Sequence, residues 1–305
     1  GGFYCAKVLE PLGADTAGSR YLDPDGSFPN HIPNPENETA MQSILDAVQE
    51  SKADLGIIFD TDVDRAGAVL SDGTELNRNR IIAMMAAILL REHPGTTIVT
   101  DSITSTGLAA FIRKHGGVHH RFKRGYRNVI NESMRLNREG HDSQLAMETS
   151  GHGALKENYF LDDGAYLVTR LLIELARAKK EGYTLESLIA DLAEPAESKE
   201  FRMNILVPDF KAYGQKIIDE LNVYAASQPG WSVAPDNFEG VRVNLDKAHG
   251  DGWFLLRLSL HDPLIPLNIE SDSVGGVRQI AAELAPFLRP FDQLDTSALL
   301  AFAGC

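Results

Sequence analysis

The chain has 305 residues, of which 43% are hydrophobic and 24% charged, a composition typical of a globular protein large enough for two or three cores. Its 43 acidic and 29 basic residues give a net charge of −14, which argues against general binding to nucleic acids or anionic membranes, since positive charge drives both. The two cysteines lie at opposite ends and exclude a disulfide framework, and the lack of a membrane-length apolar stretch or a signal peptide predicts a soluble, cytoplasmic protein.

Residues 1–75 are predicted to form an α/β unit that lacks its first strand. Three prolines stiffen the loop that ends at Pro35, because each of them fixes a backbone angle. Apolar residues at helical spacing indicate a helix after this loop, and the apolar run 53–59 indicates a buried strand. The expected elements are a helix at 2–12, a short strand at 19–22, a helix at 39–51, and strands at 53–59 and 67–70.

Residues 76–195 alternate between helical and strand patterns, which predicts a largely parallel sheet. The nearly continuous apolar run 81–90 is typical of a helix buried against a sheet. The expected helices lie at 76–90, 104–115, 126–136, 164–180 and 184–192, and the expected strands at 97–100, 118–122 and 144–147.

The polar stretch 193–199 is predicted to be a linker. Beyond it, consecutive strands flanked by helices indicate an α+β domain with an antiparallel sheet, residues 196–305. Its expected strands lie at 201–207, 240–245, 253–258 and 265–269, and its expected helices at 209–224 and 274–288.

The strand predicted at 53–59 runs into three carboxylates at alternate positions, Asp60, Asp62 and Asp64. Carboxylate oxygens are the ligands that Mg²⁺ prefers, and open α/β sheets place ligands at the carboxyl ends of strands. The pattern therefore predicts a magnesium site, with Arg65 as a contact for a phosphate that touches both charges. A solvated acidic turn after a core strand is the simpler alternative.

A phosphatase of the haloacid-dehalogenase type is a second alternative, because such enzymes place a nucleophilic Asp in a strand-terminal Asp-x-Asp. Asp60 would then attack the phosphate and Asp62 would serve as acid and base. Asp64 stands where that family usually carries Thr or Val, and the motifs further along the chain find no role in this interpretation.

Several motifs in order along the chain resemble those of the α-D-phosphohexomutase superfamily, the phosphoglucomutases and phosphomannomutases. They are Gly1-Gly2, the segment 28–35, the acidic loop, Arg124-Gly125-Tyr126-Arg127, the segments 148–152 and 160–164, and the segment 257–263. The resemblance implies two mixed-sheet α/β domains, 1–75 and 76–195, followed by an α+β C-terminal domain, 196–305. It also implies Mg²⁺ as cofactor and a hexose phosphate as substrate.

The resemblance implies a role for each candidate site residue in the middle of the chain. Glu148 and Ser150 match the residues that contact the sugar ring, where a carboxylate and a hydroxyl can read neighbouring hydroxyl groups. His152 is a candidate for proton transfer and Arg127 matches a basic position beside the substrate. For His152 the alternative is a hydrogen-bonded loop histidine, and for Arg127 it is a solvated arginine. His115, His119 and His120 flank a Gly-Gly turn without nearby carboxylates and are expected to be exposed loop residues.

Arg257, Ser259 and His261 occupy the place of the family's phosphate-binding loop, usually Arg-x-Ser-Gly-Thr-x-Pro. A guanidinium, a hydroxyl and free backbone N–H groups make an anion pocket. Leu260 replaces the glycine of that pattern and His261 replaces the threonine. A hairpin connection with one buried arginine is the alternative interpretation of this segment.

The motif that carries the phosphorylated serine of the family, similar to Thr-Ala-Ser-His-Asn, does not occur in the sequence. The chain is therefore expected to comprise the second to fourth domains of a mutase, an intramolecular phosphotransferase, with an N-terminal domain expected to pack against it. By itself the chain is expected to be inactive. A non-catalytic sugar-phosphate binding protein is a further alternative to the phosphatase.

Overall fold

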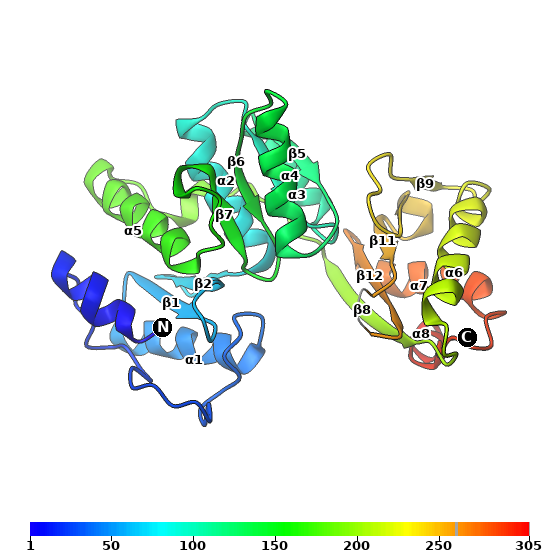
Figure 1. The fold of residues 1–305 in the computed structure, drawn as a ribbon, viewed down its shortest axis with the longest axis horizontal. Helices are drawn as coiled ribbons and strands as arrows, with labels where there is room; N and C mark the ends of the chain where they lie inside the picture. The colour runs from blue at the N-terminus through cyan, green and yellow to red at the C-terminus, as the bar shows by residue number, and fades with distance from the viewer. Residues whose placement is uncertain (260–261, 305) are drawn as a thin grey trace. The chain divides into compact units, whose positions relative to one another are not determined.

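The structure is a computed structural model that describes residues 1–259 and 262–304. The chain divides into two compact units, Gly1–Ala193 and Glu194–Cys305, which are described separately below (Figure 1). Among the described residues, no helix has both the length and the apolar character needed to cross a bilayer. Cys5 is a free cysteine, and Cys305 lies outside the described residues.

The first unit begins with an irregular N-terminal segment and a small antiparallel sheet. The helix predicted at 2–12 is present as a π-helical turn, Cys5–Leu9, followed by a 3₁₀ turn, Glu10–Leu12. Residues 19–22 are irregular, so the strand predicted there is wrong. The elements that follow are α1 (Glu38–Ser51), β1 (Leu55–Phe59), β2 (Ala66–Leu70) and β3 (Glu75–Leu76), with the sheet in the order β1-β2-β3.

A second sheet of the first unit is built from four strands in the order β5-β4-β6-β7. Strand β4 runs parallel to β5 and β6, whereas β7 pairs with β6 in the antiparallel sense. The strands are β4 (Thr97–Thr100), β5 (Val118–Arg121), β6 (Ser143–Met147) and β7 (Gly153–Leu155), and the helices are α2 (Arg78–Glu92), α3 (Thr106–Lys114), α4 (Tyr126–Arg138) and α5 (Gly164–Glu181).

Helices cover both faces of this four-stranded sheet. On one face, α2, α3 and α5 share a core with Ile98 of β4 and Leu145 of β6. On the other face, Val129 of α4 packs against Val99 and Ala146. Since a sheet covered on both sides buries its strands, the carboxyl ends of β4 and β6 are the places where polar side chains can gather. The helix predicted at 184–192 is reduced to a 3₁₀ turn, Glu186–Leu188.

The second unit is an α+β fold around a five-stranded antiparallel sheet in the order β8-β12-β11-β10-β9. Helices α6 and α7 lie on the same side of this sheet (Figure 1). Their Leu221 and Ile280 belong to one core cluster with Val243 and Phe254 of the sheet. The strands are β8 (Glu197–Asn204), β9 (Trp231–Val233), β10 (Val241–Leu245), β11 (Gly252–Leu256) and β12 (Leu264–Ser271), and the helices are α6 (Phe210–Ala225), α7 (Gly276–Leu288) and α8 (Ser297–Ala303).

Candidate functional site

The acidic loop joins β1 to β2, and Asp60 holds its shape. Asp60 is 5% exposed. Its Oδ1 accepts the backbone N–H of Val63 at 3.0 Å, and its Oδ2 accepts Nε–H of Arg65 at 2.8 Å. Burial raises the pKa of the Asp60 carboxyl, but the hydrogen bonds from Arg65 outweigh burial and leave the pKa below its usual value. Asp60 is therefore an ionised carboxylate that fixes the loop around it.

The three carboxylates of the loop lie close enough to share one cation. Asp60, Asp62 and Asp64 each offer an oxygen within 4.8 Å of the others. Burial raises the pKa of Asp64 to about 6, with His152 opposing the shift and Asp60 adding to it. The Oδ1 atom of Asp64 is buried and has no hydrogen-bond partner among residues 1–259 and 262–304. A buried oxygen without a partner beside further carboxylates suits Mg²⁺, so these residues fit the metal that the sequence predicts.

Backbone contacts join the acidic loop to the segment that carries Glu148 and His152. Arg65 and His152 form an isolated antiparallel bridge. The N–H of Gly164 donates to the carbonyl of Val63 at 3.1 Å, and a Cβ added at Gly164 would lie 2.7 Å from the carbonyl carbon of Arg65. Val63 itself adopts φ +69°, an uncommon and costly conformation for a β-branched residue. The loop is thus held in a strained shape by close backbone packing that only glycine permits at position 164.

Glu148 follows β6 and is 3% exposed. Its carboxylate accepts the N–H of Gly125 at 2.5 Å and the hydroxyl of Ser150 at 3.4 Å. Burial and the charge of Asp101 raise the pKa of Glu148 to about 7, against the lowering effects of the Gly125 hydrogen bond and of Arg124 and His152. The carboxyl group can therefore both donate and accept hydrogen bonds near neutral pH.

Asp101 is a site residue that the sequence did not indicate. It follows β4, is 0% exposed, and its Oδ2 accepts both the N–H and the hydroxyl of Thr149, at 3.2 and 2.7 Å. Because β4 and β6 run parallel, Asp101 and Glu148 meet at the same edge of the sheet. Asp101 thereby fixes the loop in which Glu148 and Ser150 lie.

His152 is hydrogen-bonded within the loop region. Its Nδ1 lies 2.8 Å from Oδ2 of Asp162 and 3.6 Å from Oδ2 of Asp64, and its ring stacks on Tyr126 with a centroid separation of 5.0 Å. Burial lowers the pKa of the imidazole, but the hydrogen bond and charge of Asp162 and the charge of Asp64 raise it above its usual value. The geometry is thus that of the hydrogen-bonded loop histidine considered from the sequence, and the neighbouring carboxylates raise the pKa of its imidazole.

Arg127 lies one residue beyond Tyr126 and is exposed. Its Nε–H donates to the Tyr126 hydroxyl at 3.0 Å, and its guanidinium lies 5.6 Å from the centre of the Tyr126 ring. The structure therefore brings Asp60, Asp62, Asp64, Arg65, Glu148, Ser150 and His152 to one region of the first unit, with Arg127 reaching that region through Tyr126.

The predicted phosphate-binding segment belongs to the second unit and joins β11 to β12. Arg257 is half-buried, and its backbone N–H donates to the carbonyl of Pro266 at 3.2 Å. The Ser259 hydroxyl accepts the N–H of Asp262 at 3.2 Å. His261 and Leu260 lie outside the described residues. The segment is a hairpin connection, an arrangement that is compatible with either interpretation of it.

Models of two family domains match the first unit. They are described as phosphoglucomutase/phosphomannomutase, alpha/beta/alpha domains II and III, and they match residues 1–73 and 77–195. The chain belongs to the phosphoglucomutase/phosphomannomutase family. The predicted membership of the α-D-phosphohexomutase superfamily is therefore confirmed, and so is the prediction that the family is one of isomerases.

Relatives in this family include a phosphoglucomutase of Neisseria meningitidis serogroup A, 30% identical over 281 residues, and a phosphomannomutase/phosphoglucomutase of Pseudomonas putida, 32% identical over 281 residues. Each match covers 92% of this chain, but only 57% of the first protein and 56% of the second. The chain thus spans less than two thirds of the length of these curated relatives.

Solved structures of the family share the fold. A phosphoglucomutase/phosphomannomutase family protein from Burkholderia thailandensis superimposes with a TM-score of 0.73 at 29% identity, covering 90% of this chain and 56% of that one. Parafusin from Paramecium, in an open form, gives a TM-score of 0.67 at 16% identity over 100% of this chain and 57% of that one, which supports the fold alone. The predicted mixed α/β fold class is confirmed.

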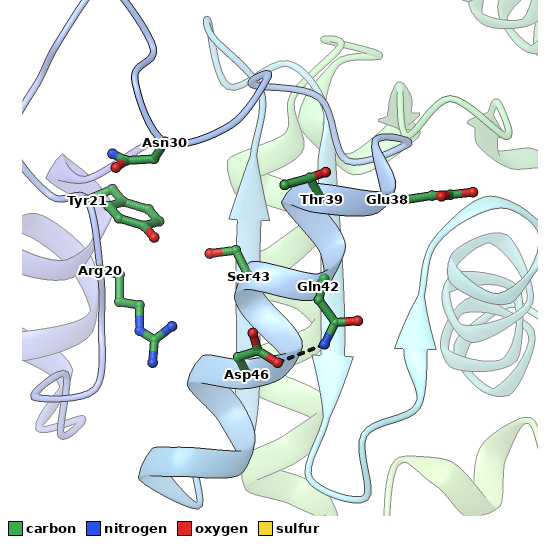
Figure 2. Close-up of a pocket in the computed structure, with 8 residues that line it drawn as sticks. All are labelled: Arg20, Tyr21, Asn30, Glu38, Thr39, Gln42, Ser43 and Asp46. Carbon is green, nitrogen blue, oxygen red and sulfur yellow. Dashed lines mark hydrogen bonds between the residues drawn. The ribbon is translucent and has the colours of Figure 1, made fainter.

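Two other features lie apart from the family site. Figure 2 shows a pocket between the N-terminal segment and α1, none of whose lining residues was predicted to be functional, and in which Gln42 donates to Asp46 at 2.7 Å. The prediction that His115, His119 and His120 are exposed loop residues without nearby carboxylates is wrong, because His119 and His120 lie in β5, His115 lies 3.2 Å from Asp191 and His120 lies 2.8 Å from Glu132. The packing of α4 on the sheet that contains β5 brings Glu132 to His120, which sequence spacing did not reveal.

Proposed function

We propose that this chain supplies the Mg²⁺-binding and hexose-phosphate-binding parts of a phosphohexomutase, which moves phosphate between O1 and O6 of a hexose. The backbone bridge between Arg65 and His152 carries this proposal, because it places the acidic loop beside the Glu148 segment. The three parts are 1–75 for the metal, 76–195 for the sugar and 196–305 for the distal phosphate.

In the proposed reaction, a phosphoserine gives its phosphoryl group to the hexose monophosphate and forms a 1,6-bisphosphate. After this intermediate turns around, its other phosphate returns to the serine. Bound Mg²⁺ would supply electrostatic stabilisation of the transferring phosphoryl group. Arg65 would add a second positive charge beside it, while Glu148 and Ser150 hold the sugar hydroxyls.

The remaining residues would orient and anchor the substrate. His152, whose pKa is raised by its contacts with Asp162 and Asp64, would hold or give a proton at a sugar hydroxyl. Arg127 would lie at the edge of the sugar site, and Arg257, Ser259 and His261 would anchor the distal phosphate. The phosphoserine would come from sequence outside residues 1–305.

Exposed apolar side chains support a contact with such further sequence. Phe3, Leu12, Tyr21 and Ile32 are each more than half exposed, at 54, 74, 53 and 63%. Four exposed apolar side chains within one irregular segment are positions that a further domain could cover. We propose that an N-terminal domain packs on this segment.

The contacts of Asp60 disfavour the phosphatase alternative. Both of its carboxylate oxygens accept hydrogen bonds, and the residue is 5% exposed. These contacts fix the carboxylate against Arg65 and the loop backbone but leave lone pairs for a metal ion, so they favour a structural and metal-binding role for Asp60.

Magnesium binding can be measured directly. We expect Mg²⁺ to bind weakly to the purified chain, and Asp62→Asn to weaken binding by at least about tenfold, because a neutral amide replaces one of three anionic ligands. Isothermal titration calorimetry measures both affinities. Asp72→Asn, an exposed Asp in the nearby β2 turn, is the matched control and should leave the isotherm unchanged. Identical isotherms for wild type and Asp62→Asn would exclude the assignment.

The phosphate role of Arg257 can be separated from a structural one. We expect Arg257→Ala to weaken binding of glucose 6-phosphate by roughly tenfold to a hundredfold, because a charged hydrogen bond contributes about 1.5–3 kcal/mol. Binding of unphosphorylated glucose should change little. Arg289→Ala removes an exposed guanidinium of the same unit and serves as control. Equal losses for the sugar and the sugar phosphate would make Arg257 a structural residue.

A further inference from the structure

A second group of metal-ligating side chains lies beside the acidic loop and shares one residue with it. Asp64, His152 and Asp162 each offer a donor atom within 4.8 Å of the others. Nδ1 of His152 is the central donor, 2.8 Å from Asp162 and 3.6 Å from Asp64. Four donors around Zn²⁺ at bond lengths of about 2.0–2.1 Å are separated by roughly 3.4 Å, so small shifts would close this group on an ion.

We propose that Asp64, His152 and Asp162 form a second metal site, which takes a borderline divalent ion such as Zn²⁺ in preference to Mg²⁺. An imidazole with two carboxylates suits Zn²⁺ and neighbouring transition metals, whereas Mg²⁺ prefers oxygen ligands alone. Water would complete the coordination, since the three side chains remain 30, 18 and 13% exposed.

The three donors are held in place before any ion arrives. The N–H of Gly153 donates to the second oxygen of Asp162 at 3.1 Å, and Ala154 and Asp162 form an isolated backbone bridge. The Arg65 bridge fixes His152, and Tyr126 covers one face of its ring. Donors fixed by backbone and stacking contacts lose little conformational freedom on binding, which strengthens a metal site.

The site also has an electrostatic reason to take a cation. Two carboxylates face one imidazole nitrogen, and the Oδ1 atom of Asp64 is buried without a hydrogen-bond partner in the part of the chain that the structure describes. A buried polar atom without a partner is unfavourable, and a divalent ion bound to Asp64 would relieve this cost. Because a metal binds an imidazole nitrogen only when that nitrogen carries no proton, Zn²⁺ binding at Nδ1 of His152 should weaken as the pH falls.

The zinc site shares Asp64 with the proposed magnesium site, and His152 also has the proton-transfer role proposed above. Asp62 belongs only to the magnesium site and Asp162 only to the zinc site, so these two residues distinguish the sites. Each site can therefore be removed while the other is measured in the same protein. A loss of one without the other distinguishes a failed zinc site from a failed mutase assignment.

Calorimetry of Zn²⁺ binding to the full chain at a fixed pH tests the site. We expect His152→Gln and Asp162→Asn each to weaken Zn²⁺ binding by more than about tenfold, because even second-shell changes cost tenfold to a hundredfold. Asp62→Asn should leave Zn²⁺ binding within about threefold of wild type while it weakens Mg²⁺ binding. His249→Gln is the matched control, since His249 also contacts an aspartate, at 2.6 Å, but has no second carboxylate within bonding distance among the described residues.

Nitrogen-15 spectra of wild type labelled at histidine give a readout that does not depend on a variant folding. Zn²⁺ is expected to shift the Nδ1 resonance of His152 first, with saturation at one equivalent. An unchanged Zn²⁺ isotherm for both His152→Gln and Asp162→Asn would overturn the proposal. A first shift at any histidine other than His152 would overturn it as well.

Discussion

Replacing Glu148 by Gln is expected to stabilise the first unit above pH 7, an unusual result for a change at a buried polar residue. Burial and the charge of Asp101 raise the pKa of Glu148 from 4.5 to about 7. In the unfolded chain the carboxyl group ionises near its usual pKa of 4.5. Between pH 4.5 and about 7, the folded state therefore binds more protons than the unfolded state. Stability from this group is therefore present below pH 4.5 and is lost as pH rises to about 7.

The size of the effect follows from the shift. The rise in the pKa from 4.5 to about 7 corresponds to roughly 3 kcal/mol in the free energy of unfolding. Gln keeps an oxygen that can accept the N–H of Gly125 but cannot ionise. We expect Glu148→Gln and wild type to be about equally stable near pH 4 and to diverge by at most about 3 kcal/mol above pH 7.

Urea unfolding followed by circular dichroism across this pH range measures the effect. Both tryptophans, Trp231 and Trp253, lie in the second unit, so their fluorescence is an internal control that should not respond. Glu181→Gln changes an exposed glutamate at the end of α5 and should give no pH-dependent difference. A Glu148→Gln variant that is less stable than wild type above pH 7 would contradict the assigned burial and charge environment.

The second large effect is an absence of turnover. Purified residues 1–305 are expected to bind hexose phosphates but not to interconvert the 1- and 6-phosphates. Acid, base and metal groups cannot store a phosphoryl group between two half-reactions, whereas a covalent phosphoenzyme can. An assay coupled to glucose 6-phosphate oxidation detects conversion from the 1-phosphate with high sensitivity.

Interconversion by this chain that survives each of Ser102→Ala, Ser105→Ala and Ser150→Ala would be the contrary result. Phosphate release that depends on Mg²⁺ and is abolished by Asp60→Asn would instead favour the phosphatase alternative. Binding without turnover, even after the remainder of a mutase is supplied, would favour a non-catalytic sugar-phosphate binding protein.

Elements with a strong apolar pattern could be predicted from the sequence, and weakly patterned ones could not. Helix α2, with its continuous run of buried apolar residues, and strand β1 both begin and end within a few residues of their predicted positions. The strand predicted at 19–22 is absent because a short strand needs a pairing partner, and this segment has none among the described strands. Strands β7 and β9, three residues each, and the short helix α8 give too little periodicity to be recognised.

The position of two candidate site residues at the ends of strands could be predicted, but their partners could not. Asp60 and Glu148 each stand directly after an apolar run, where ligands gather in α/β sheets. Asp101 approaches Glu148 only because β4 and β6 pair in parallel, and Asp162 reaches His152 only because the segment after β7 bridges back to Ala154. The raised pKa of Glu148 depends on these tertiary contacts, so sequence spacing alone does not indicate it.

The most direct test of the proposed function joins this chain to the part of the Neisseria meningitidis phosphoglucomutase that the match leaves uncovered. The account expects Mg²⁺-dependent interconversion of glucose 1- and 6-phosphates in the joined protein, and a loss of activity of at least about a hundredfold in its Glu148→Ala form. Circular dichroism confirms that both joined proteins are folded. A folded joined protein without mutase activity, or one whose activity is unchanged by Glu148→Ala, would contradict the account.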